Sequence, residues 1–119
     1  MYPFVAPKRR CCCEDMSSPY VQIAEIEIDQ AELEDYKSAV KEHAETAIRA
    51  EPGVLVLFAV SEKDKPTSIR VFEVYASVEA YKAHLEAPHF KKYKSVTEKM
   101  VKSLRLVKTD PVALSSKLR

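Results

Sequence analysis

The side chains best suited to acid–base chemistry in this chain are three histidines and one glutamate in an apolar setting. They are His43, His84, His89 and Glu73. Histidine has an unperturbed pKa of about 6.5, so it can accept a proton at neutral pH. A glutamate among apolar residues must find a partner, and it would either orient a histidine or bind a substrate hydroxyl group. Proton transfer by a general base is therefore the chemistry that these residues predict.

His84 is the first choice as the base. It shares one side of a predicted helix with Tyr81 and Leu85, because residues three and four apart lie together on a helix. His89 is the second choice, since Pro88 interrupts the helix just before it and could turn its ring toward the sheet. The alternative is that His89 caps or braces this break.

His43 and Glu73 also have structural interpretations. His43 follows Val40 by three residues, at the edge of an apolar helical stripe, where a histidine is more often a core or boundary residue hydrogen-bonded to the backbone. Glu73 shares one strand face with Val71 and Tyr75, because side chains alternate along a strand. A buried ion pair between Glu73 and an arginine is the alternative to a role in binding.

Aromatic residues near these groups are candidates for the walls of a substrate pocket. A planar ring packs well against flat side chains, although an aromatic at such a position is often plain core. The four candidates are Phe58, Tyr75, Phe90 and Tyr93. We expect no metal site, because the histidines stand in no His-Glu-x-x-His pattern and no cysteine pair accompanies them.

Hydrophobic periodicity predicts the elements that position these residues. Strands are expected over residues 20–28, 54–60, 69–75 and 104–107. A first helix is expected over residues 30–50, and a second begins after Ser77 and is broken at Pro88. Gly53, the only glycine, is expected to supply the backbone freedom for a tight exit from the first helix.

The order of these elements predicts an α+β fold of the ferredoxin-like βαββαβ type. Its four-stranded antiparallel sheet would carry both helices on one face. Residues 54–60 are apolar on both faces of their strand, yet the helices cover only one. A second sheet from another copy of the chain would cover the other face, which predicts a homodimer resembling a barrel.

Composition excludes several classes of partner. Nineteen lysines and arginines against eighteen aspartates and glutamates give a net charge of +1, so no basic face for nucleic acid or a membrane surface is indicated. No apolar run approaches the length of a membrane helix, and no signal peptide is recognisable. These features predict a soluble cytoplasmic protein.

The expected domain covers residues 20–108, between a flexible extension of residues 1–19 and a tail of residues 109–119. Three consecutive cysteines, Cys11 to Cys13, follow a basic run in the extension. This pattern has lipidation as an alternative interpretation. With no cysteine elsewhere, neither an intrachain disulfide framework nor an all-cysteine zinc site is expected in the domain.

Three segments together resemble the antibiotic biosynthesis monooxygenase (ABM) family. They are Glu51-Pro52-Gly53-Val54, the strand with Phe72-Glu73-Val74-Tyr75, and the run from His84 to Tyr93, HLEAPHFKKY. The resemblance extends from about residue 20 to residue 107. It implies ferredoxin-like subunits paired as a dimeric α+β barrel, in agreement with the order of elements.

The resemblance implies a cofactor-independent oxygenation of an electron-rich aromatic compound, a quinol or phenol, by O2. The family also includes an isomerase of a phosphorylated sugar and haem-degrading enzymes. The haem-degrading members use asparagine, histidine and tryptophan, and this chain has no asparagine or tryptophan. An acid–base isomerase of a small phosphorylated carbonyl compound and a non-catalytic dimeric binding module remain as alternatives, because fold alone does not fix function.

Overall fold

The computed structural model describes residues 18–117, and its elements follow the predicted order. The strands are β1 (Tyr20–Ile28), β2 (Val54–Ser61), β3 (Ser68–Tyr75) and β4 (Val101–Lys108). The helices are α1 (Leu33–Ala50), α2 (Val78–Glu86) and α3 (Pro88–Thr97), with short 3₁₀ turns η2 (Gln30–Glu32) and η3 (Glu98–Met100). The strands pair antiparallel in the order β2-β3-β1-β4, which confirms the ferredoxin-like α+β fold.

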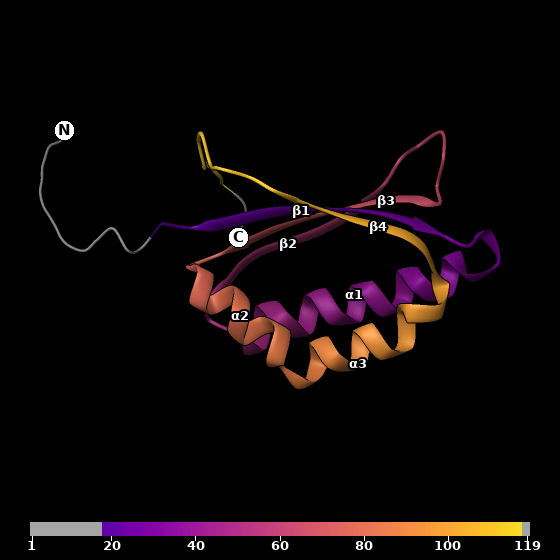
Figure 1. Ribbon diagram of the computed structural model, residues 1–119, viewed down its shortest axis with the longest axis horizontal. Coiled ribbons are helices and arrows are strands. Elements are labelled where there is room, and N and C mark those ends of the chain that lie inside the picture. The colour runs from indigo at the N-terminus through magenta and orange to yellow at the C-terminus, as the bar shows by residue number, and fades with distance from the viewer. Residues whose placement is uncertain (1–17, 118–119) are drawn as a thin grey trace, which may run out of the picture.

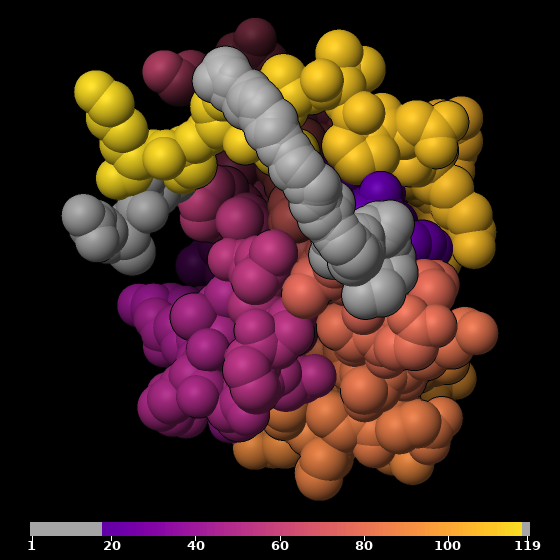
Figure 2. All heavy atoms as spheres, turned by 90° about the vertical axis from the view of Figure 1, so that its left-hand side faces the viewer, coloured from indigo at the N-terminus to yellow at the C-terminus, as the bar shows by residue number. Residues whose placement is uncertain are grey.

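The three helices lie together on one face of the sheet (Figure 1). Seen from one end of the molecule, α1 lies beside α2 and α3 as two neighbouring columns (Figure 2). The core fills the space between this layer and the sheet. Its buried apolar side chains include Ile26, Ile28, Tyr36, Val71 and Tyr75.

Strand alternation directs the functional residues toward the helices. In β3, the buried residues Ile69, Val71 and Tyr75 share the helix-facing side with Glu73, as the sequence predicts. In β1, Gln22 lies on the same side and opposite Glu73 in the sheet. Two polar side chains therefore stand in an otherwise apolar layer.

The outer face of the sheet carries apolar side chains that no part of residues 18–117 covers. Phe58 of β2 is paired with Phe72 of β3, and 45% and 40% of their surfaces are exposed. Val60, on the same side of β2, is also exposed. These residues lie where the sequence predicts contact with a second copy of the chain.

The predicted signals at the helix ends are present. The Ser77 hydroxyl accepts a hydrogen bond from the backbone N–H of Ala80 at 3.1 Å and so caps α2. Ala87 is extended (φ −70°, ψ 143°), and Pro88 then occupies the first turn of α3. The predicted break at Pro88 is confirmed, and it separates α2 from α3.

The prediction that Gly53 is needed for backbone freedom in the turn after α1 is wrong. Its φ angle lies outside the left-handed region that favours glycine, so the turn itself does not require one. A Cβ atom on Gly53 would instead lie 2.7 Å from the Cβ of Ala80, closer than two carbons can pack. The close approach of α2 at Ala80 therefore leaves no room for a side chain at residue 53.

Cys11 to Cys13 and the rest of the predicted extension up to residue 17 lie outside the described residues. Residues 109–117 form no helix or strand, and the Thr109 hydroxyl donates a hydrogen bond to the Val21 carbonyl at 2.7 Å. Within residues 18–117, no helix combines the length and apolar character needed to cross a membrane.

Candidate functional site

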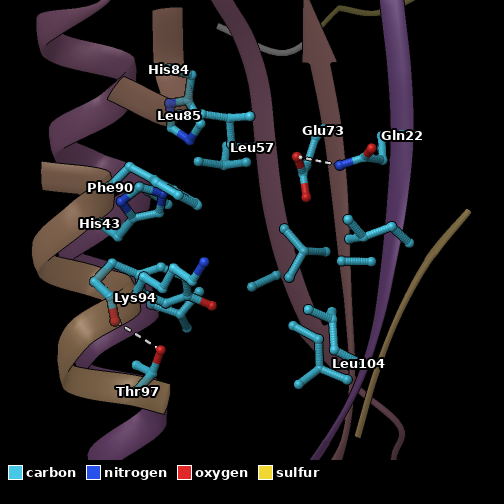
Figure 3. A pocket seen from close by; sticks show the side chains of 18 of the residues that line it. Gln22, His43, Leu57, Glu73, His84, Leu85, Phe90, Lys94, Thr97 and Leu104 are labelled. Carbon is cyan, nitrogen blue, oxygen red and sulfur yellow. Dashed lines mark hydrogen bonds between the residues drawn. The ribbon is translucent and has the colours of Figure 1, made fainter. Parts of the chain in front are cut away.

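A cavity of about 560 Å³ lies between the helices and the sheet. Figure 3 shows side chains from both layers pointing into it. Its wall is largely apolar, with aliphatic side chains from β1, β2, β3 and β4. Its polar groups are Gln22, His43, Glu73, Tyr75, Tyr81, His84, Tyr93, Lys94, Thr97 and Glu98. An apolar cavity with few polar groups is the usual form of a small-molecule site.

The structure brings most of the predicted site residues to this one cavity. His43 comes from α1, Glu73 and Tyr75 from β3, His84 from α2, and Phe90 and Tyr93 from α3, and all six contribute to its wall. Tyr81 and Leu85 join His84 on the wall, so the predicted common side of α2 does face the cavity. A single ligand could contact two histidines and a carboxyl group there.

His84 is held by a carboxylate that the sequence analysis did not assign to the site. Nδ1 of His84 lies 2.8 Å from Oε2 of Glu51, the residue that ends α1. The His84 side chain is 3% exposed and that of Glu51 is 16% exposed. A carboxylate that accepts a hydrogen bond from one ring nitrogen fixes the ring orientation and leaves the other nitrogen free to accept a proton.

His89 lies outside the wall of this cavity. Its Nε2 contacts the same Oε2 atom of Glu51, and its ring also borders a smaller hollow of about 50 Å³ between α1 and α3. His43 lines both spaces. His89 thus contacts Glu51 directly after the break at Pro88 and does not line the main cavity.

His43 is a buried imidazole in its neutral form. Its ring stacks on Tyr93 with centroids 4.5 Å apart, and its Nδ1 is buried without a hydrogen-bond partner among the described residues. Burial, together with the neighbouring rings of His84 and His89, lowers the pKa of His43 to about 4. His43 is therefore an uncharged residue in the cavity wall.

Glu73 is partnered by neutral groups and not by an arginine. Its Oε1 accepts hydrogen bonds from the Tyr75 hydroxyl at 2.7 Å and the Gln22 amide at 3.3 Å. Arg70, the arginine of the same strand, instead pairs with Glu62 at 3.0 Å. Burial raises the pKa of Glu73, and the two hydrogen bonds oppose this rise. Its second oxygen, Oε2, makes no hydrogen bond within the described part of the chain.

Three buried tyrosines in and beside the site, Tyr36, Tyr75 and Tyr93, remain protonated. The hydroxyl groups of Tyr36 and Tyr93 lie 2.7 Å apart, which anchors Tyr93 beside His43. Burial raises the pKa of Tyr36, Tyr75 and Tyr93 above the ordinary value for a phenol. They therefore act as hydrogen-bond donors and flat walls and not as bases.

Phe58, like His89, is a predicted site residue that lies outside the wall of the main cavity. It stands on the outer face of the sheet, and the wall of the main cavity does not include it. The register shifts between Val54 and Val56, so that Val54 and Leu57 are both buried on the helix side although they are three residues apart. This bulge moves Phe58 to the opposite face.

Sequence reasoning missed Glu51, Gln22 and Lys94. Glu51 stood in the sequence only as the end of a helix and as part of the Glu-Pro-Gly motif, and that motif was the available signal. Gln22 could have been found from the alternation of β1, whose even-numbered residues face the helices. Lys94 carried no signal, because it lies on an exposed stretch of α3 rich in lysine.

Comparison with known proteins agrees with this geometry. The family model described as antibiotic biosynthesis monooxygenase matches residues 19–96. A solved putative antibiotic biosynthesis monooxygenase from Bacteroides thetaiotaomicron is 42% identical, with a TM-score of 0.82, over 88% of this chain and 100% of its own.

Two further solved structures have the same fold. A putative monooxygenase from Lactobacillus acidophilus is 32% identical, with a TM-score of 0.75, over 77% of this chain and 44% of its own. A putative antibiotic biosynthesis monooxygenase from Nitrosomonas europaea is 21% identical with a TM-score of 0.77, a likeness of fold, over 87% of this chain and 100% of its own. The search of curated proteins gave no match. The family model and the 42% identical structure show that the chain belongs to the antibiotic biosynthesis monooxygenase family.

Proposed function

We propose that this protein is a cofactor-independent monooxygenase that oxidises a small electron-rich aromatic compound, a quinol or a phenol, with O2. The observation that carries the proposal is the pairing of His84 with Glu51 at the wall of an apolar cavity. Family membership supports a monooxygenase, and the cavity supports the class of substrate.

His84 is the proposed base. With Glu51 accepting the proton of Nδ1, the Nε2 atom of His84 keeps its lone pair for the hydroxyl proton of the substrate. The phenolate that forms is electron-rich enough to transfer an electron to O2.

The reaction balances without any other reductant. A phenol with a free ring position and O2 give a quinone and water: one oxygen atom enters the ring and the other leaves as water. The substrate supplies the two hydrogen atoms of the water and all four electrons that reduce O2. Neutral hydrogen-bond donors around the cavity would stabilise the negative charge that develops on the substrate and on oxygen during the reaction. Tyr75 and Tyr93 are the rings suited to packing against a planar substrate.

A homodimer is part of the proposal. The exposed apolar side chains of the outer sheet face, among them Phe58, Val60 and Phe72, support a sheet-to-sheet contact with a second copy. Such a contact would close a barrel of two sheets.

One observation favours the second candidate, an acid–base isomerase of a small phosphorylated carbonyl compound. Lys94 lies at the cavity wall, where its ammonium group could hold a phosphate. Glu98 shares that wall, however, and its carboxylate would repel the same phosphate. The binding-module alternative expected all histidines outside the pocket, whereas His43 and His84 line it.

The test is oxygen consumption by the metal-free and flavin-free protein with a panel of hydroquinones and phenols. We expect uptake above the autoxidation rate that falls about 10²–10⁴-fold in His84→Ala, the range for loss of a general base. Lys82→Ala is the matched control on an exposed position of the same helix and should leave uptake unchanged. No uptake with any compound would move the assignment to the isomerase, with proton exchange on phosphorylated carbonyl compounds as the next assay.

A further inference from the structure

Three potential metal ligands converge where the three helices meet. Glu51 follows the end of α1, His84 lies in the last turn of α2, and His89 lies in the first turn of α3. One carboxylate oxygen and one nitrogen of each ring lie within 4.8 Å of one another. The chain separations of 33 and 38 residues between Glu51 and the histidines hide this cluster in the sequence.

The geometry needs little movement to accept an ion. Both imidazoles direct a nitrogen to the same atom, Oε2 of Glu51, with the His84 Nδ1 at 2.8 Å. Ligands that bind zinc at 2.0–2.2 Å in a tetrahedral arrangement stand roughly 3.3 Å apart. Small rotations of the three side chains would open this space.

The ligands are held in place by their surroundings. The side chains of Glu51 and His89 are 16% exposed and that of His84 is 3% exposed. The rings of His84 and His89 both pack near His43, with centroids 5.1 and 5.7 Å away. Side chains fixed by packing lose little freedom on binding an ion, which favours binding.

We propose that Glu51, His84 and His89 form a binding site for one divalent transition-metal ion. Two imidazoles and one carboxylate suit Zn²⁺, Co²⁺ or Fe²⁺, whereas Mg²⁺ and Ca²⁺ prefer oxygen ligands alone. Three protein ligands leave at least one coordination position for water. The site is distinct from the cavity wall, because only His84 belongs to both.

The ion would act on the cavity through the ring of His84. A metal bound at Nδ1 requires the remaining proton of the neutral ring to sit on Nε2. That nitrogen would then donate a hydrogen bond and could not accept a proton. If His84 is the base, as proposed above, a loaded site inhibits the reaction and a chelator restores it.

The test measures metal binding directly and does not depend on activity. The background is the full chain with Cys11→Ser, Cys12→Ser and Cys13→Ser, because cysteine thiolates bind the same metals. Isothermal titration with Zn²⁺ and the visible absorption of Co²⁺ report stoichiometry and ligand field. We expect one equivalent per chain and at least a tenfold weaker affinity in Glu51→Gln and in His89→Gln.

His43→Gln is the matched control, since its ring lies beside the cluster but outside the ligand set. It should bind Co²⁺ as the parent does. Circular dichroism in the presence of a chelator shows whether each variant is folded. Absence of Co²⁺ bands in the folded parent, or equal affinity in all variants, would overturn the proposed site. Oxygen uptake by the chelated protein separates this outcome from a failure of the monooxygenase proposal.

Discussion

Nδ1 of His84 lies 2.8 Å from Oε2 of Glu51, and this contact decides which nitrogen of His84 faces the cavity with a lone pair. The two residues come from the ends of different helices, α2 and α1. Their contact therefore depends on the tertiary packing of the helix layer. The base in the proposed reaction is consequently a pair of residues and not a single histidine.

Glu51→Gln tests this pair. The glutamine amide can donate a hydrogen bond to Nδ1 of His84, which favours the opposite tautomer and removes the lone pair on Nε2. We expect oxygen uptake by metal-free protein to fall about 10²–10⁴-fold, as for His84→Ala, with little change in fold. Steady-state uptake rates for the two variants and their double mutant provide the measurement. Full activity in Glu51→Gln would refute the pairing.

The lowered pKa of His43 predicts that the protein loses stability in acid. Its folded pKa of about 4 lies below the unfolded value of 6.5, so the unfolded chain binds the extra proton first as the pH falls. The neutral ring carries no penalty above pH 6.5, and the penalty grows as the pH falls to 4, where it reaches about 3 kcal/mol of unfolding free energy.

The check compares denaturant unfolding of the wild type and His43→Gln at pH 7 and pH 4.5. The relevant quantity is the difference in pH dependence between the two proteins, because His43 is absent from only one of them. We expect the wild type to lose clearly more stability on acidification than the variant. Equal losses would show that His43 does not titrate as a buried group.

Strand alternation and helical spacing were sufficient to predict much of the site. Glu73 and Tyr75 alternate with outward-facing residues in β3, and Tyr81 with His84 recurs at helical spacing in α2. These patterns depend only on local geometry. For this reason the sequence could assign those side chains to common faces of their strand and helix before any packing was known.

Two features depended on information that is not local. Counting alternately from the buried Val54 directs Phe58 to the helix side, but the bulge after Val54 reverses that parity. Glu51 meets His84 and His89 only when α2 and α3, which are separated at Pro88, pack against the end of α1. A bulge in a uniformly apolar strand and a contact between three helix ends leave no periodic signal.

Gly53→Ala should destabilise the protein by about 1–3 kcal/mol, the usual cost of an overpacked core. The new Cβ would lie 2.7 Å from that of Ala80, so α2 must shift. Ala80→Gly removes the obstructing methyl group and costs about 1 kcal/mol by itself in a helix. We expect the double mutant to lose less unfolding free energy than the two single variants lose together. Strict additivity in chemical denaturation would contradict the proposed contact.

Phe72→Lys should convert the proposed homodimer to a monomer. Phe72 lies on the outer sheet face opposite Ile23 of β1 and Phe58 of β2, so a lysine there would bring a charge into the centre of a sheet-to-sheet contact. Val96→Lys is the matched control, because Val96 is similarly exposed, at 43%, but lies on α3. Light scattering after gel filtration should give twice the chain mass for the wild type and the control. A monomeric wild type would refute the dimer, and a dimeric Phe72→Lys would move its interface off this face of the sheet.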